Sequence, residues 1–277
     1  MKKFYFLMAS LCLHFLSQAQ TDTTVIVDDA DTIRIGRMII IRKGDRTTRE
    51  HSDDRPQTPK PKRKPSNVTT NWGIVDIGFS NFKDNTVYTS AQTQQFAPTA
   101  NEDWFQLRNG KSVNVNVWFF MQRLNMIKHV VNLKYGLGLE LNNYMYEGNI
   151  RYAENPTLIY MDTKDYSKNK LAADYVTVPL MLNFNFTPNS EKGYKNFGFS
   201  AGASAGYLYS SRQKYISSET GKQKTKDDFD MRPLKVSYIA ELQLGPVKFY
   251  GSMADRSMYK KGLDHTPYNV GIRLSSW

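Results

Sequence analysis

The sequence predicts an all-β protein: an eight-stranded antiparallel transmembrane β-barrel, preceded by a signal peptide and a mobile N-terminal arm. Three observations in the 277 residues lead to this fold class. Apolar and polar residues alternate with a period of two from Asn71 to the C-terminus. Long and short connections alternate between the predicted strands, and several strands exceed ten residues, as tilted membrane strands do.

Composition excludes several other classes. The net charge of +11 and the mean hydropathy of −0.55 exclude a bundle of membrane helices. The single cysteine excludes a disulfide framework and a cysteine-based zinc site. Gly 17 and Pro 11 are ordinary for a folded chain, and aromatic residues make up 13%.

Residues 1–19 have the pattern of a signal peptide. Lys2 and Lys3 precede a short apolar stretch, and Ser17-Gln18-Ala19 supplies small residues at the cleavage site. A lipoprotein alternative at Cys12 is disfavoured because the bulky Leu11 stands before it. Cleavage after Ala19 predicts an exported chain without cysteine.

Two segments lie between the signal peptide and the barrel. Residues 20–41 form a short β-like periplasmic segment, with runs at Thr23 to Val27 and Thr32 to Ile41 around an acidic turn. That turn lacks the glycine and the distal glutamate of a calcium loop. Residues 42–70 form a basic, proline-rich linker, which we interpret as a solvated tether, the alternative being an arm that binds phosphates. Export argues against nucleic acid as its partner.

The barrel domain spans residues 71–277. Its eight predicted strands alternate over Val75 to Phe79, Val113 to Met121, Val131 to Leu141, Val176 to Phe186, Phe197 to Tyr209, Leu234 to Leu244, Val247 to Met253 and Tyr268 to Leu274. Pro179 lies inside the fourth strand, so one neighbouring carbonyl should lack its ladder partner.

The distribution of charge decides which face of each strand points inward. A soluble lipocalin-like barrel would carry its apolar face inside. Here the apolar set contains no charge, whereas the opposite set is rich in Gly, Ser and Asn and holds charges of both signs. Such a set suits a narrow lumen filled by paired side chains. The predicted lumen network consists of Asp76, Lys134, Glu140, Lys235, Glu241, Lys248 and Arg273.

Connection lengths predict the orientation. The long connections are 80–112, 146–172, 210–232 and 254–266, and the short ones lie near Asn125, at Asn189 to Gly193 and at Gly245-Pro246. Bacterial outer-membrane barrels have short periplasmic turns and long outer loops. We therefore expect location in the cell outer membrane, with the N-terminal arm and the C-terminus in the periplasm. Aromatic residues at strand ends, among them Phe184, Phe186 and Tyr207, predict an interfacial girdle.

The domain from about Asn71 to Trp277 resembles the PorT-like outer-membrane β-barrel family. The resemblance rests on the strand Tyr175-Val176-Thr177-Val178-Pro179-Leu180, on the glycine-rich strand with Gly198, Gly202, Gly206 and Tyr207, and on the end Gly271 to Trp277. Trp277 departs from the pattern because its parity is opposite to that of Ile272 and Leu274. The resemblance implies an outer-membrane barrel that often lacks an assigned activity, with one branch serving protein secretion and gliding.

Little in the sequence predicts catalysis. The histidines His14, His51, His129 and His265 have no metal-ligand spacing, and we expect neither metal nor cofactor. Asp264-His265 is interpreted as an exposed polar pair, the alternative being half of an acid–base pair of a rim enzyme. Asp227, Asp228 and Asp230 with Lys222, Lys224 and Lys226 are interpreted as a solvated loop.

The predicted function is therefore structural or partner-binding: a non-enzymatic membrane anchor with interacting loops or a periplasmic arm. The expected partners are outer-membrane lipid and either lipopolysaccharide phosphates or an envelope protein, without nucleic acid. The alternatives are a small-solute channel, a transport or secretion component, and a rim enzyme acting on lipid or peptide.

Overall fold

The computed structural model describes residues 32–35, 38–41, 66–154, 156–188 and 196–274 and divides into two compact units, Met1–Lys62 and Arg63–Trp277. In the first unit, β1 (Thr32–Ile35) pairs with β2 (Met38–Ile41) as an antiparallel hairpin. The run from Thr32 to Ile41 is thus two short strands instead of one. The predicted signal peptide, residues 42–65 of the predicted linker and Trp277 lie outside the described residues. The end of the predicted 42–70 linker is wrong, because Val68 to Thr70 are the first residues of the strand Val68–Asp84.

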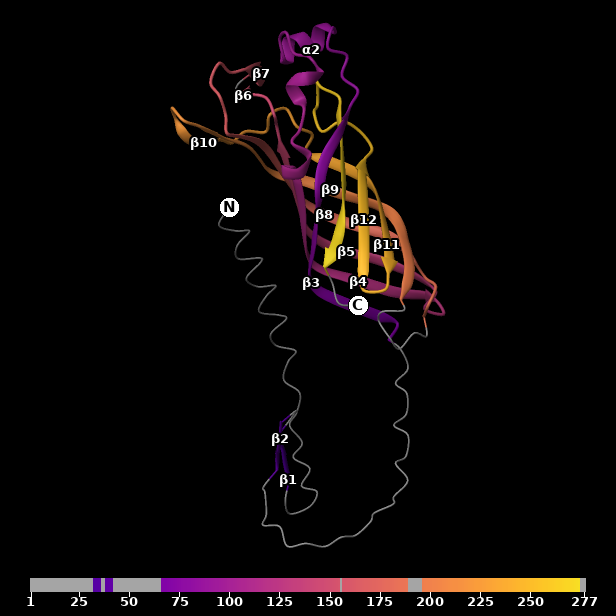
Figure 1. Cartoon of the computed structure of the whole chain (residues 1–277). Coiled ribbons are helices and arrows are strands. Elements are labelled where there is room, and N and C mark those ends of the chain that lie inside the picture. Colours follow the sequence, from indigo (N-terminus) through magenta and orange to yellow (C-terminus); the bar gives the residue numbers. More distant parts are fainter. Residues whose placement is uncertain (1–31, 36–37, 42–65, 155, 189–195, 275–277) are drawn as a thin grey trace, which may run out of the picture. The chain divides into compact units, whose positions relative to one another are not determined.

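The second unit is a closed antiparallel ring of eight strands, which confirms the predicted all-β, eight-stranded antiparallel barrel (Figure 1). Each strand pairs with the next, and β13 pairs with β3 to close the ring. The strands are β3 (Val68–Asp84), β4 (Val113–Ile127), β5 (Val131–Met145), β8 (Lys168–Asn185), β9 (Phe197–Ser217), β11 (Leu234–Leu244), β12 (Val247–Ala254) and β13 (His265–Leu274).

Burial alternates along the strands as the sequence predicts. On β3, Asp76 is buried while Ile77 and Phe79 are exposed, and on β8 the exposed Leu180 lies beside the buried Met181. Polar and small side chains therefore fill the interior. Apolar side chains form the outer surface, where a tilted strand of the predicted length would meet hydrocarbon.

A β-bulge at Phe119 corrects the predicted faces of β4. Trp118 pairs with Gly138 but Phe120 pairs with Leu137, so Phe119 is an extra residue relative to β5. Phe119 is 48% exposed, as predicted, but Met121, which was predicted to face outward, is fully buried. Phe120, which was predicted to face inward, is only partly buried. One inserted residue moves every later side chain of a strand to the opposite face. The alternation hides this because five apolar residues, Val117 to Met121, follow one another here.

A second bulge lies where β8 and β9 leave the cylinder. Asp174 pairs with Ser210 and Tyr175 pairs with Leu208, so Tyr209 is the extra residue. Both strands extend beyond this point into what the sequence predicted as loop. β10 (Gly221–Thr225) pairs only with this end of β9, and Figure 1 shows it projecting sideways from the ring.

Pro179 sits at an interruption of one ladder. It pairs with Ser204 of β9, but between β5 and β8 the register passes from Tyr135 and Leu180 directly to Gly138 and Thr177. The proline thus coincides with a two-residue gap on its β5 side, as expected for a residue without an N–H group.

The four long connections gather at one end of the ring, called here the loop end; the three short ones form the turn end. The first connection contains α2 (Ala91–Phe96), η1 (Glu102–Phe105) and η2 (Asn109–Lys111). The second contains the hairpin β6 (Ile150–Ala153) and β7 (Leu158–Met161). No helix within the described ranges is long and apolar enough to cross a membrane.

Candidate functional site

A chain of ion pairs crosses the centre of the ring. Asp76 and Arg273 lie opposite each other in the β3–β13 register, and the guanidinium donates from Nε to Oδ1 at 2.6 Å and from Nη2 to Oδ2 at 2.8 Å. Arg273 also donates to Glu241 of β11, which accepts a further bond from Lys134 of β5. Four strands are thereby joined by alternating charges.

A second group centres on Glu140 of β5. Its carboxylate pairs with Lys235 and accepts hydrogen bonds from Asn142 and Asn269, each at 3.1 Å. The Lys235 ammonium lies 4.2 Å from the centre of the Tyr175 ring. Buried charges persist only where partners satisfy them, so this geometry stabilises the filled lumen.

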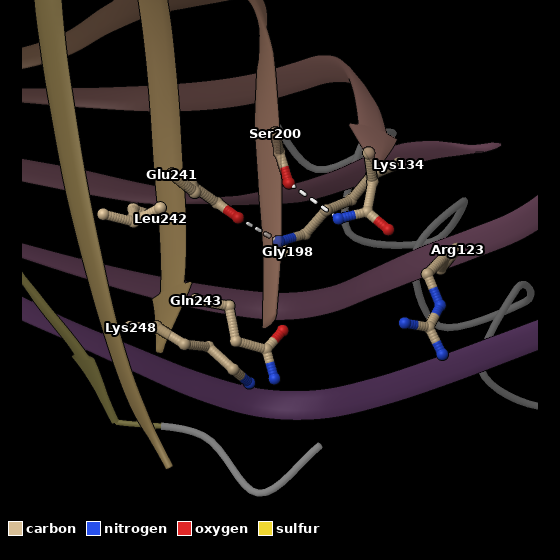
Figure 2. A pocket seen from close by; sticks show the side chains of 9 residues that line it. Arg123, Lys134, Gly198, Ser200, Glu241, Leu242, Gln243 and Lys248 are labelled. Atoms are coloured by element: carbon tan, nitrogen blue, oxygen red, sulfur yellow. Dashed lines mark hydrogen bonds and ion pairs between the residues drawn. The ribbon is translucent and has the colours of Figure 1, made fainter. Parts of the chain in front are cut away.

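The structure thus brings six of the seven predicted lumen residues into two ion-paired groups. The seventh, Lys248, is 5% exposed and lines the same space as Lys134 and Glu241. Figure 2 shows Lys134, Glu241, Lys248 and Arg123 directed toward a shared cavity. Leu242 points away from it.

Glycines make room for the bulky residues of the lumen. Gly78 and Gly271 are opposite each other, and a Cβ on Gly78 would lie 2.5 Å from the Tyr250 hydroxyl and 2.4 Å from the Val270 carbonyl. The Tyr250 hydroxyl crosses to donate to Asn114 at 2.5 Å. This close packing leaves interior cavities of about 20 and 30 Å³, each with room for a water molecule or two.

The connections of the loop end share one hydrophobic core, which we call the loop cap. The sequence analysis missed it, because its residues are scattered among polar ones without a regular period. Its buried members are Phe96, Ala97, Ala100, Phe105, Leu107, Tyr144, Tyr146, Ile150, Tyr152, Ile159, Leu171, Ala173, Tyr175, Phe229, Met231, Met258, Tyr259 and Leu263.

Three tyrosine hydroxyls form a buried chain inside the loop cap. Tyr152 lies between Tyr146, at 2.8 Å, and Tyr259, at 2.7 Å. Burial raises the pKa of Tyr146 to about 12 and holds the pKa values of Tyr152 and Tyr259 well above their usual range. The three hydroxyls therefore stay protonated at physiological pH, each supplying a hydrogen-bond donor to the core.

His265 is not in an exposed loop, as the sequence analysis expected, but is the first residue of β13 and fully buried. Its ring stacks on Phe82 with 4.2 Å between centroids, and its Nε2 lies 3.3 Å from Asp84. Tyr88 donates to the same carboxylate at 2.5 Å, and burial together with this bond raises the pKa of Tyr88 well above its usual value. Asp264 remains exposed, so the two neighbours do not act as a pair.

The lysines and aspartates predicted to form one solvated loop are only partly in a loop. Lys222 and Lys224 lie on β10 and are strand residues, not loop residues. Asp228 and Asp230 do lie in a connection, where they pair with Lys260 and Lys261 at 3.0 and 3.6 Å. Across the described part of the chain, no group of three or more His, Cys, Asp or Glu side chains could hold a metal ion.

A closed antiparallel ring with an apolar exterior, an ion-paired interior and loops gathered at one end defines a transmembrane β-barrel. The model of the outer membrane protein beta-barrel domain family matches residues 64–252, more than half of the chain. The chain therefore belongs to this family and is an outer-membrane protein.

The chain was also compared with curated sequences and with solved structures. No curated protein sequence matches the chain. Among solved structures, the chain is similar to Ail, the attachment invasion locus protein of Yersinia pestis, solved in complex with the heparin analogue sucrose octasulfate. The identity is 12% and the TM-score 0.28, over 74% of this chain and 100% of that one.

Proposed function

We propose that the protein is a non-conducting, non-enzymatic barrel that presents the loop cap to a partner at the surface of the outer membrane. The filled lumen carries this proposal. Two ion-paired groups cross it, and the cavities between them, of about 20 and 30 Å³, accommodate water but no solute of metabolite size.

The proposed orientation places the loop end outside the cell, with the N-terminal arm and the C-terminus in the periplasm. The support is the alternation of long and short connections around an even number of strands, which is the arrangement of bacterial outer-membrane barrels. A folded loop cap with its own core then forms the surface that meets the environment.

The burial of His265 favours a binding role over a rim enzyme. A general acid or base must come within hydrogen-bond reach of its substrate. The imidazole is enclosed by Phe82, Phe105 and Tyr259, and its exposed fraction is 0%. Its contacts are those of a core residue that joins β13 to β3.

The partners in this proposal are outer-membrane lipid around the barrel and lipopolysaccharide phosphates or an envelope protein at the loop end. We also propose that the chain is PorT-like within this family. The strand with Pro179 and the glycine-rich β9 support this assignment. A role in secretion would then be exerted through contacts of the loops or the arm, because the lumen is filled.

Planar-bilayer recording of the purified, refolded full chain tests the proposal. We expect no stepwise conductance for the wild type. A variant in which Trp118 and Tyr250 are replaced by Ala serves as the positive control, since these side chains occupy the lumen. Reproducible wild-type conductance steps would identify a channel and overturn the proposal.

Surface labelling tests the orientation separately. Lys260 and Lys261 are exposed at the loop end. An amine-reactive, membrane-impermeant reagent should label them in intact cells and lose that labelling in the variant K260Q/K261Q. Labelling only after the outer membrane is opened would mean that the loop end faces the periplasm.

A further inference from the structure

Six cations gather on one face of the strand extension beyond the Tyr209 bulge. Lys170 of β8, Lys214 of β9 and Lys224 of β10 are direct neighbours in the register, so their side chains leave the same face of three adjacent strands. We call these three residues the lysine ladder. Lys168 and Lys222 flank Ile216 in the next row of the same face, and Arg212 lies in the row nearer the barrel.

The opposite face of the extension is covered. Gln213 of β9 donates to the Ile150 carbonyl at 2.8 Å and accepts from the Tyr152 amide at 3.1 Å, so the β6–β7 hairpin lies over it. Asn169 donates to the same Ile150 carbonyl at 2.7 Å. The ladder therefore occupies the one face of the extension that this hairpin leaves uncovered.

That face continues the lipid-facing surface of the barrel. Tyr207 and Tyr209 of β9 are 57% and 46% exposed and end its apolar outer stripe. The extension then projects sideways from the ring in Figure 1, so the face that was outward on the barrel turns toward the plane of the membrane. Tyrosine at such a boundary is typical of the membrane interface.

The charges of the ladder meet little compensation within the described residues. Arg212 pairs with Asp174, and the Lys170 ammonium donates to the Asn143 amide oxygen at 2.7 Å. Within the described ranges, none of Lys168, Lys170, Lys214, Lys222 and Lys224 forms an ion pair with a carboxylate. Like charges directly opposite each other destabilise a sheet, so an external anion would stabilise this arrangement.

We propose that the lysine ladder binds the phosphate groups of lipopolysaccharide. Arg212 and Lys214 lie three and five residues beyond Tyr209. With a rise of ~3.3 Å per residue, they lie roughly 10 and 17 Å along the strand beyond the tyrosine. The extension carries these cations sideways over the membrane surface beside the barrel. In the proposed orientation that surface is the outer leaflet, whose lipopolysaccharide presents phosphate groups to the face that carries the ladder.

This inference rests on the proposed orientation, because lipopolysaccharide surrounds the ladder only if the loop end faces outward. Its test measures lipid binding directly and does not depend on conductance. Failure of the lipid-binding test would leave a silent, outward-facing barrel, whereas failure of the conductance test would leave lipid binding unaffected.

The experiment uses the full chain folded in neutral detergent micelles and measures the apparent Kd for diphosphoryl lipid A. The comparison probes are dephosphorylated lipid A, inorganic pyrophosphate and heparin. We expect the triple variant K170Q/K214Q/K224Q to bind diphosphoryl lipid A roughly 100-fold more weakly, and K214Q alone roughly 5-fold more weakly. The matched control K83Q/K111Q/K261Q removes three exposed lysines of the loop end outside the ladder and should change the Kd less than about 3-fold.

Heat-modifiable gel migration verifies that each variant is folded, and K214Q keeps the test decisive if the triple variant fails to fold. Equal affinity for dephosphorylated lipid A would overturn the proposal, as would equal losses in the control variant. Tighter binding of pyrophosphate than of lipid A would assign the ladder to a free phosphate, and tighter binding of heparin would assign it to a soluble polyanion; either result rejects the lipid.

Discussion

Replacing Arg273 with Met should destabilise the barrel more than any comparable change on its surface. Methionine retains the aliphatic part of the side chain but removes the guanidinium, which donates two bonds to Asp76 and one to Glu241. Asp76 is fully buried, and it would keep only the bonds from Trp118 at 2.7 Å and from Asn116 at 3.3 Å.

The expected loss follows from the burial of the partners. Removing one member of a buried ion pair costs about 3–5 kcal/mol, because the remaining charge stays enclosed without compensation. Adding Asp76→Asn to Arg273→Met neutralises that charge and leaves Glu241 paired with Lys134. We therefore expect the double variant to regain at least ~2 kcal/mol of the free energy of unfolding relative to Arg273→Met.

Urea unfolding in micelles measures these differences, with tryptophan fluorescence as the signal because Trp118 contacts Asp76 directly. Arg256→Met is the matched control: its ion pair with Asp255 is also short, at 2.8 Å, but Arg256 is 63% exposed. Water screens such an exposed pair, so its loss should change stability little. If Arg273→Met lost no more stability than Arg256→Met, the lumen would be hydrated and the argument for a filled barrel would fail.

Three further changes test other parts of the structure. Leu180 is 55% exposed on the outer face, and Leu180→Arg places a charge there. The substitution should lower the free energy of unfolding by ~2–4 kcal/mol and reduce the heat-modifiable fraction in outer membranes. Normal assembly of this variant would reverse the face assignment. Gly78→Ala should lower the midpoint of thermal unfolding because its Cβ would meet the Val270 carbonyl at 2.4 Å, whereas Gly110→Ala, with open space around it, should not; equal midpoints would refute the close packing. Since the pKa of Tyr146 rises from about 10 unfolded to about 12 folded, its contribution of roughly 3 kcal/mol should be complete below pH 10 and lost between pH 10 and 12. Tyr146→Phe should flatten the stability profile in that range, and an unchanged slope would contradict the assignment.

The strands and their faces were predictable because alternation is a local signal. A residue such as Lys134 stands between the apolar Leu133 and Tyr135, so its direction follows from its immediate neighbours. The bulge at Phe119 was not predictable, because it lies in a run of five consecutive apolar residues, Val117 to Met121, that is compatible with either register.

The loop cap and the lysine ladder depend on contacts that the sequence does not show. Tyr152 and Tyr259 are 107 residues apart, and nothing around either one indicates burial. The ladder becomes visible only once the register places Lys170, Lys214 and Lys224 side by side. Such contacts depend on the register of the strand extension and on how the long connections fold together, not on the local pattern.

The seam between the first and the last strand of the ring has a consequence for biogenesis. Three side-chain polar contacts cross it at facing positions: Arg273 with Asp76, Ser80 with Asn269, and His265 with Asp84. All of these β13 residues belong to the strand that closes the ring on β3. Until β13 pairs with β3, Asp76 lacks the guanidinium that neutralises it and the ring stays open. Closure of the cylinder and neutralisation of this buried carboxylate are therefore one event.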